Sequence, residues 1–379
     1  MALVLDEEQT MLRDAAHNFL SEKAPISELR GLRDGRDETG YSKHTWSAMV
    51  EMGWAGIIIP EAYDGLGFSH VGAGMVMQEM GRTLTPSPYF STSIVGATLI
   101  AANGRDEQKQ MLLPGMAAGT IRTALALDES GRHRPNQIAM RAQTADNGFE
   151  LSGSKQFVLD GHIADKLIVA ARTSDDDRDQ AGITLFLVDA DAPGVTRRRS
   201  VMVDSRNAAR IHFDQVRVSG DAVLGEVGGG FAPLDTALDV GRMYLAAEMA
   251  GIAEESFVRT IDYLKQRDQF GQKIGSFQAL QHRAAHLYSE IELAKSVVLK
   301  GLQALDENSA QTRQLASMVK AKAGSVAMLA TNEAVQMHGG IGMTDDFDIG
   351  FFMKRARVAQ ETFGDAAFHT DRLATLSGY

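Results

Sequence analysis

The chain has 379 residues, of which 44% are hydrophobic and 23% charged, an ordinary globular composition that predicts two or three domains. Its 38 Lys and Arg residues against 49 Asp and Glu residues give a net charge of −11, which disfavours nucleic acid as the main partner because phosphate binding needs a basic face. The absence of cysteine excludes disulfides, thiolate nucleophiles, iron–sulfur clusters and cysteine zinc sites.

The sequence contains no pattern typical of a targeting or membrane-spanning segment. It begins MALVLDEEQT, which turns acidic early and lacks the basic region of a signal peptide. The longest apolar stretches, such as GWAGIIIP and KLIVAA, are far shorter than the ~18 residues of a spanning helix. We therefore expect a cytoplasmic protein that has no membrane partner.

Residues 1–120 are predicted to form a helical domain. Apolar residues recur at helical spacing in DEEQTMLRDAAHNFLSEKA and in YSKHTWSAMVEMGW. Asp6 is the predicted N-cap of the first helix, because two acidic residues follow it in the first turn. The apolar run IIIPEAYDGLGF is interrupted by proline and glycine, so we expect a loop there.

Residues 121–225 are predicted to form a compact antiparallel β domain. Short apolar or alternating segments, such as FELSGSKQFV, DKLIVAARTS and ARIHFDQVRV, are separated by turn formers such as DNG and DAPG. The charge run Asp175–Asp179 is interpreted as the solvated tip of a hairpin.

Residues 226–379 are predicted to form a helical bundle, because three long segments keep a wide apolar stripe. The preceding GEVGGGF lacks the Lys and Ser/Thr of a phosphate-binding P-loop and is interpreted as a flexible link. The expected fold is therefore α+β and multidomain, with an N-terminal helical domain, a middle antiparallel β domain and a C-terminal helical bundle.

One pair of histidines has a spacing that metal sites use. His282 and His286 lie four residues apart in HRAAH, on one helix face. The zinc-protease pattern requires a Glu directly after the first His, and this chain has Arg283 there. Without a third ligand in view, we predict no metal site.

Two other stretches have the chemistry of ligand binding. QMHGGIGMT, at 336–344, contains paired glycines that would let backbone N–H groups approach a phosphate, although a helix C-cap is the better explanation of this stretch taken alone. RDQFGQKIGSFQ, at 267–278, places Arg267 and Phe270 beside a glycine-containing turn. An arginine there could fork onto a pyrophosphate, and a phenylalanine could pack on a planar ring. Each stretch is ambiguous when taken alone.

Taken together and in this order, the motifs resemble those of the acyl-CoA dehydrogenases, over nearly the whole chain. RDQFGQKIGSFQ is similar to the family's R-x-x-F-G-x-x-I-x-x-F-Q stretch, and QMHGGIGMT to its Q-x-x-G-G-x-G segment. PEAYDGLG resembles the N-terminal P-E-x-x-G-G-x-G loop, and LSGSKQFVLDG the L-x-G-x-K strand beside the flavin.

The resemblance implies a tetramer with a helical N-terminal domain, a β domain and a C-terminal four-helix bundle, with FAD as the cofactor and acyl-CoA as the substrate. It implies flavin-binding roles, on the ADP side and at the ring, for Arg267, Phe270, Phe277, Gln278, Gln336, Gly339, Gly340 and Phe157. It implies substrate-binding roles for Asp239, Arg242 and Gly364. An electron-transfer flavoprotein is the implied electron acceptor.

The sequence departs from the family pattern where the reaction occurs. The chemistry requires a carboxylate that removes the α-proton of the thioester while flavin N5 takes the β-hydride, in a dry pocket. The usual Glu precedes Gly364, and that position is Phe363; the alternative position is Gly241. LDESGRHRP replaces the T-E-P-G-A-G-S-D stretch beside the ring, so the ADP-side motifs are kept while the ring-side motifs are degraded.

Three functions remain open on this evidence. The first is an active acyl-CoA dehydrogenase with a relocated base, for which Asp365, Glu248 and Glu361 are weak candidates; Asp365 could instead cap a helix, and Glu248 could be solvent-facing or ion-paired. The second is a supporting subunit that lacks the base, in an α2β2 enzyme of fatty-acid or steroid side-chain β-oxidation. The third is a flavin oxidase or monooxygenase on the same fold, against which the retained Asp239 and Arg242 argue mildly.

Overall fold

The computed structural model describes residues 3–174 and 180–379, so the charge run Asp175–Asp179 and its predicted hairpin tip lie outside the described residues. The chain folds into two units that each combine distant segments. The first unit comprises Met1–Gly31, Ser69–Thr85 and Arg242–Tyr379. The second unit comprises Leu32–Phe68 and Pro86–Gly241.

The first unit begins with helices that the local sequence specifies well. These are α1 (Glu7–Lys23), α2 (Ile26–Asp34), which continues into the second unit, and α4 (His70–Thr83). Asp6 caps α1 as predicted, because its carboxylate accepts from the Gln9 N–H at 2.8 Å while the Gln9 side chain accepts from the Asp6 N–H at 3.1 Å. α4 is buried along almost its whole length, which explains its many small and apolar residues.

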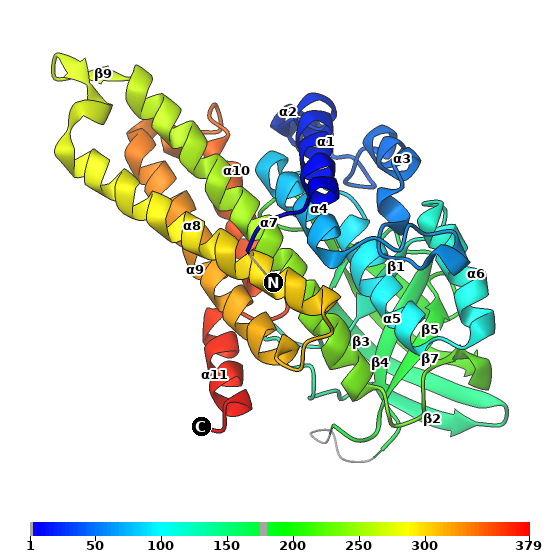
Figure 1. Cartoon of the computed structure of the whole chain (residues 1–379). Coiled ribbons are helices and arrows are strands. Elements are labelled where there is room, and N and C mark those ends of the chain that lie inside the picture. The colour runs from blue at the N-terminus through cyan, green and yellow to red at the C-terminus, as the bar shows by residue number, and fades with distance from the viewer. Residues whose placement is uncertain (1–2, 175–179) are drawn as a thin grey trace. The chain divides into compact units, whose positions relative to one another are not determined.

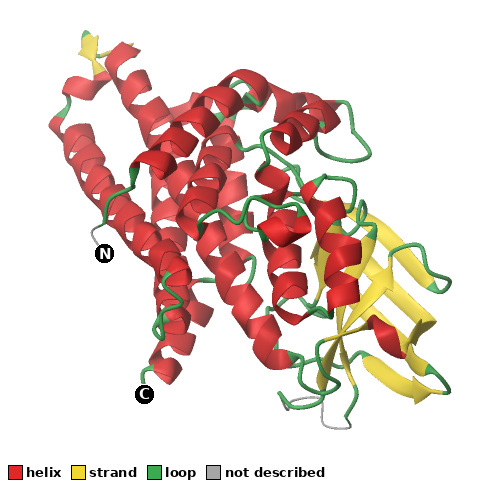
Figure 2. Ribbon diagram, turned by 45° about the vertical axis from the view of Figure 1, so that its right-hand side comes forward, coloured by secondary structure: helices red, strands yellow, loops and turns green. Residues whose placement is uncertain are grey.

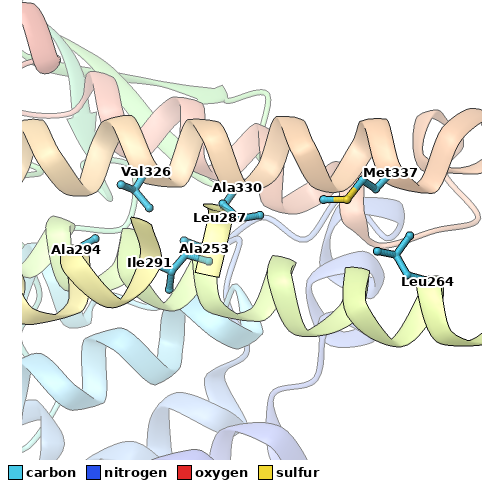
Figure 3. Packing of buried hydrophobic residues seen from close by; sticks show 8 residues of the cluster. All are labelled: Ala253, Leu264, Leu287, Ile291, Ala294, Val326, Ala330 and Met337. Carbon is cyan, nitrogen blue, oxygen red and sulfur yellow. The ribbon is translucent and has the colours of Figure 1, made fainter. Parts of the chain in front are cut away.

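Long helices make up the rest of the first unit (Figure 1). They are α7 (Phe231–Gln266), which starts in the second unit, α8 (Gln278–Asp306), α9 (Thr312–His338), α10 (Ile349–Glu361) and α11 (Ala366–Leu376). Figure 3 shows how α7, α8 and α9 meet through a cluster of buried side chains: Ala253, Leu264, Leu287, Ile291, Ala294, Val326, Ala330 and Met337. Removing this apolar surface from water stabilises the bundle, by about 25 cal/mol for each Å² buried.

The second unit carries the remaining helices of the N-terminal region. They are α3 (Lys43–Glu51), the short helices η1 (Trp54–Gly56) and η2 (Glu61–Tyr63), the π-helix η3 (Tyr89–Gly96), α5 (Ala97–Asn103) and α6 (Asp106–Ala117). The predicted loop around Pro60 therefore contains a single turn of 3-10 helix. No helix in the described part of the chain is both long and apolar enough to cross a membrane.

The sheet of the second unit is formed by β1 to β8 (Figure 2). These strands are β1 (Thr123–Ala126), β2 (Arg141–Ala145), β3 (Gly148–Leu159), β4 (Lys166–Arg172), β5 (Ile183–Asp189), β6 (Val195–Val201), β7 (Asn207–Ser219) and β8 (Val223–Leu224). Their order is β6-β7-β3-β2-β4-β5-β8, with β1 paired to β4.

The prediction of a purely antiparallel domain was wrong in one respect: β1 and β2 both pair with β4 in parallel. Alternating hydrophobicity tells which face a residue occupies but not the direction of the neighbouring strand. The β2–β3 hairpin supplies the long connection that a parallel β1–β4 pair requires. All other strand pairs of this sheet are antiparallel in the described residues.

Candidate functional site

Three phenylalanines have left-handed backbone conformations, which are rare for bulky residues. Their φ angles are 51° at Phe157, 55° at Phe270 and 57° at Phe363. Such a conformation costs about 1–3 kcal/mol and persists only where the surroundings enforce it. The sequence resemblance assigned these three residues to the flavin ring, the ADP side of the flavin and the base position, respectively. All three described phenylalanines in this conformation therefore lie at positions for which a function was predicted, and seven other non-glycine residues of the described chain also have positive φ.

The Phe363 turn joins α10 to α11, and buried donors hold its first carbonyl. Arg242 Nε donates to the Phe363 carbonyl oxygen at 3.3 Å, and His369 Nε2 lies 3.0 Å from the same oxygen. Because a carbonyl oxygen only accepts, Nε2 of His369 must carry the hydrogen. Arg242 and His369 are both fully buried. Burial, with Arg242 as the next cause, lowers the pKa of His369 to about 2, so this imidazole is neutral.

Lys320 on α9 holds the other end of the same turn. Its ammonium donates to the carbonyl oxygens of Gln360, at 2.7 Å, and of Gly364, at 2.9 Å. Burial and, secondly, Arg242 lower the pKa of Lys320 to about 7. Gly364 has φ 103°, and a Cβ added there would lie 2.4 Å from the Phe368 ring, so only glycine fits.

Two of the three carboxylates proposed as a relocated base lie near this turn. Asp365 caps α11, because its carboxylate accepts from the Phe368 N–H at 2.8 Å. Glu361 lies at the end of α10, is about half exposed and pairs with Arg357 at 3.0 Å. A half-exposed carboxylate lacks the dry environment that strengthens a base. The arrangement favours a helix-capping role for Asp365 and a surface ion pair for Glu361.

The third candidate, Glu248 on α7, forms a buried ion pair with Arg355 on α10. Arg355 Nε and Nη2 donate to the two carboxylate oxygens at 2.8 and 2.6 Å. The side chains are 0% and 6% exposed. A bidentate bond of this kind engages both oxygens of the carboxylate. The geometry favours the ion-pair interpretation of Glu248 over a role as the base.

The proposed CoA-contacting residues both lie on α7. Asp239 and Arg242 are almost completely buried; Asp239 lies near the end of the second unit, and Arg242 begins the C-terminal segment of the first. Beyond its bond to Phe363, the Arg242 guanidinium lies 5.7 Å from the centre of the Phe368 ring. Arg242 therefore acts on the turn at the base position, and its contact with CoA stays a prediction.

The predicted ADP-side residues sit at the far end of α7 and α8, where Figure 1 shows the β9 hairpin. The hairpin consists of β9 (Asp268–Gln269) and β10 (Gln272–Lys273), followed by the 3-10 helix η5 (Ile274–Ser276). The Phe270 ring is 90% exposed and lies edge-on to Phe277, 6.1 Å away. Arg267 and Gln278 are exposed, and Arg267 has no ion pair with any described residue. The hairpin thus presents an uncompensated cation beside an exposed aromatic ring.

The glycine loop Gly339–Met343, η6, directly follows α9. Gly339 ends α9 with φ 68°, so the C-cap interpretation is correct, and side chains at Gly339 or Gly340 would meet nothing within 4 Å. The buried His338 ring stacks on Tyr263 at 4.4 Å, and its Nε2 has no partner among the described residues. Gln336 is exposed one turn earlier. Open backbone and an unsatisfied imidazole nitrogen therefore lie side by side at this loop.

The predicted ring-side residue lies on β3 in the second unit. Phe157 is 57% exposed at an irregularity between Lys155 and Val158, where the β3–β7 register shifts. Fully buried Lys155 donates to the Leu127 carbonyl at 3.0 Å and to the Glu129 carboxylate at 2.7 Å. Burial lowers its pKa. The segment that replaces the family's ring-side motif is thus anchored to the strand that carries Phe157.

Sequence reasoning missed Lys320, His369 and Arg355. Lys320 lies among small and apolar residues in ASMVKAKAG, and that break in the pattern was the available signal. His369 and Arg355 have polar neighbours, in FHTDR and MKRAR, so no comparable signal marks them in the sequence. For the metal question, the described residues contain no group of three or more potential ligands, and both His282 and His286 are exposed.

Models of the N-terminal, middle and C-terminal domains of acyl-CoA dehydrogenases match residues 6–120, 124–216 and 228–376. The chain belongs to the acyl-CoA dehydrogenase family. It is 31% identical to the probable acyl-CoA dehydrogenase YngJ of Bacillus subtilis, over 98% of both chains. Butyryl-CoA dehydrogenase of Megasphaera elsdenii is similar in structure, with a TM-score of 0.90, 28% identity and 100% of both chains covered.

A third acyl-CoA dehydrogenase relative is a variant of the Tcur3481-Tcur3483 steroid ACAD, with a TM-score of 0.88, 31% identity and 98% coverage of both chains. These matches confirm the predicted family and fold class. They likewise confirm the prediction of an FAD-dependent oxidoreductase of the acyl-CoA dehydrogenase type.

Proposed function

We propose that this chain takes part in α,β-dehydrogenation of an acyl-CoA thioester as the subunit without the base in an α2β2 assembly. One observation carries this proposal: Phe363 occupies the base position, and the candidate carboxylates Asp365, Glu248 and Glu361 are engaged elsewhere. The sister subunit would supply the carboxylate that removes the proton at Cα. The two designations in the name of the steroid relative agree with a two-chain enzyme.

The ADP-side residues of this chain fit FAD. Arg267 offers an unpaired guanidinium for a phosphate, and exposed Phe270 offers a ring for adenine. Gly339 and Gly340 leave open backbone, beside the unsatisfied Nε2 of His338. When bound, FAD supplies flavin N5 as the acceptor of the hydride that leaves Cβ.

The residues of this chain would bind and orient the thioester and the flavin, and they would exclude water from the reacting atoms. Arg242 and His369 fix the Phe363 carbonyl, so that the Phe363 side chain, 9% exposed, closes the place where relatives of the family carry the base. A rigid apolar wall keeps water from the reacting carbons. Asp239 would contact the CoA portion together with Arg242. The same proposal has three further parts. The acyl chain is fatty or steroid-derived, the electron acceptor is an electron-transfer flavoprotein, and the location is cytoplasmic.

Co-expression with a homologue that carries the base tests this assignment. We expect the chain alone to be colourless or substoichiometric in flavin, and the co-purified complex to contain equal amounts of both chains and bound FAD. A homotetramer of this chain alone with one FAD per subunit, bleached by acyl-CoA, would instead favour a relocated base. A fully yellow protein that no thioester bleaches favours the oxidase or monooxygenase alternative.

A further inference from the structure

Lys320 is a buried cation whose partners are backbone carbonyls rather than carboxylates. The side chain is 1% exposed, and Nζ donates to Gln360 at 2.7 Å and to Gly364 at 2.9 Å. In the described part of the chain it makes no ion pair. The Gln360 carbonyl belongs to the last turn of α10, where carbonyls lack helical partners, and Gly364 lies just before the N-cap of α11. One ammonium group thus bridges the end of one helix and the approach to the next.

The bridged turn needs outside support. Phe363 and Gly364 are consecutive residues with positive φ, 57° and 103°. A phenylalanine in this region is strained, and the strained form persists only where contacts enforce it. Arg242 and His369 hold the Phe363 carbonyl, and Lys320 holds the Gly364 carbonyl. The donors of α7, α9 and α11 together fix both peptide groups of the turn.

We propose that Lys320 is a positioning residue, whose side-chain Nζ holds the Phe363–Gly364 turn in the geometry that thioester binding requires. The link to the thioester rests on the proposed function, which places this turn beside the substrate. The link to the turn rests only on the bonds of Lys320.

The charge of Lys320 depends on groups from every element around it. On α7 these are Arg242 and Glu248; on α10, Arg355 and Glu361; before and on α11, Asp365, His369 and Arg372. Glu248 and Arg355 neutralise each other, and His369 is neutral. Burial and Arg242 oppose the charge, while Glu361 and Asp365 favour it, so the pKa of Lys320 falls to about 7.

Lys320 can hold the turn in either protonation state, because a neutral amine still donates hydrogen bonds. The lowered pKa of Lys320 means that the closed turn favours the neutral amine more than water does. Opening of the turn that exposes the amine to water is therefore opposed more strongly as the pH rises from about 7 towards 10.5, and thioester affinity rises with it.

The test compares the flavin-containing complex with its Lys320→Met and Lys322→Met variants. Lys322 is the matched control, because it lies on the same helix and pairs with Glu290 at 2.5 Å, away from the turn. Hydrogen–deuterium exchange of peptides covering residues 360–369 measures the turn directly. Flavin spectral perturbation by butyryl-CoA or a longer acyl-CoA, from pH 6 to 9, measures binding.

We expect Lys320→Met to speed exchange of the turn by about tenfold and to weaken thioester binding by a similar factor at pH 8, since both hydrogen bonds of Nζ are lost. The unmodified complex should gain affinity as the pH rises above 7, the Lys320→Met variant should not, and Lys322→Met should behave as the unmodified complex does. Unchanged exchange at residues 360–369 in Lys320→Met overturns the proposal, as does an unchanged pH profile.

The two proposals fail in distinguishable ways. If exchange of the turn responds to Lys320→Met while no thioester perturbs the flavin, the clamp stands and the proposed function fails. If the variant does not fold, exchange in the unmodified complex decides: after correction for intrinsic rates, it should slow as the pH rises above 7 at residues 360–369 but not along α8. A uniform pH response would contradict the role of Lys320.

Discussion

Arg355 binds both carboxylate oxygens of Glu248, at 2.8 and 2.6 Å, inside the helical bundle. The pair joins α7 to α10, whose end leads into the Phe363 turn. Removing one partner of such a pair leaves an uncompensated buried charge, which costs about 3–5 kcal/mol.

We expect Glu248→Gln to lower the free energy of unfolding by that amount, because Arg355 loses its counter-charge, as measured by urea denaturation of the complex. Thioester-dependent flavin reduction should persist in the fraction that folds. The control is Glu254→Gln, since Glu254 is partly exposed and its partner Lys295 keeps Glu292 nearby. Loss of flavin reduction with unchanged stability would make Glu248 the base after all.

Two substitutions of Asp365 distinguish a structural role of this residue from a catalytic one. Asp365→Ala should destabilise α11 by about 1 kcal/mol, because the cap on the Phe368 N–H is lost. Asp365→Asn should cost little, since asparagine caps as well as aspartate does. Thermal unfolding of both variants checks this. If flavin reduction instead disappears in Asp365→Asn, where the cap is kept and the ionisable group is gone, Asp365 is the base.

Installing a carboxylate at the base position should create activity. Phe363→Glu places an acid on a turn that already accepts a side chain in the left-handed backbone conformation and whose Phe363 carbonyl is held by Arg242 and His369. General base catalysis contributes about 10²–10⁴-fold, so we expect anaerobic flavin bleaching by acyl-CoA to rise by at least the lower figure in a complex whose sister subunit has lost its own base. Phe363→Gln is the control that keeps the shape and removes the charge. Equal rates in the two variants would show that this turn does not face the thioester.

Arg267 should be needed for cofactor retention. It is exposed and has no ion pair with the described residues, so Arg267→Met should raise the FAD dissociation constant by about tenfold or more and reduce its dependence on salt. Arg283→Met is the matched control, because Arg283 is also exposed but pairs with Glu333 at 2.6 Å. Flavin fluorescence released on dilution measures the effect. Equal retention in both variants would contradict the assignment.

The depressed pKa of Lys320 predicts a specific dependence of stability on pH. With a folded-state pKa of about 7 and an ordinary value of 10.5, the unfolded chain binds more protons between these values. The free energy of unfolding of the natural chain, relative to Lys320→Met, should therefore rise with pH across that window, with a limiting slope of about 1.4 kcal/mol per pH unit. Urea denaturation at pH 6, 8 and 10 tests the sign. A difference that does not change with pH would mean that Lys320 titrates normally.

The sequence predicts elements whose determinants are local. Asp6 lies beside the residues it caps, and the long apolar stripes of α7 to α9 repeat often enough to be recognised. The parallel pairing of β1 with β4 was not predictable in this way, because it depends on which strands meet across the β2–β3 hairpin. The first unit likewise joins segments from opposite ends of the chain.

The same distinction between local and long-range determinants applies to the candidate site. Arg267, Phe270 and the glycine loop lie in short motifs, so the resemblance found them. The Lys320 clamp joins residues 40 and 44 positions apart, and the His369 contact is specified only once α11 folds back after the turn. No single motif contains both Lys320 and its partners, because burial and neighbouring carbonyls, rather than sequence spacing, bring them together.

The measurement that tests the central claim most directly is anaerobic titration with acyl-CoA of three preparations: this chain alone, the complex with its base-bearing homologue, and the same complex with that homologue's base changed to Gln. We predict that only the unmodified complex is bleached, because this chain has a phenylalanine, Phe363, at the position where the family carries its catalytic carboxylate. Bleaching of this chain alone, or of the complex without the homologue's base, would contradict the account.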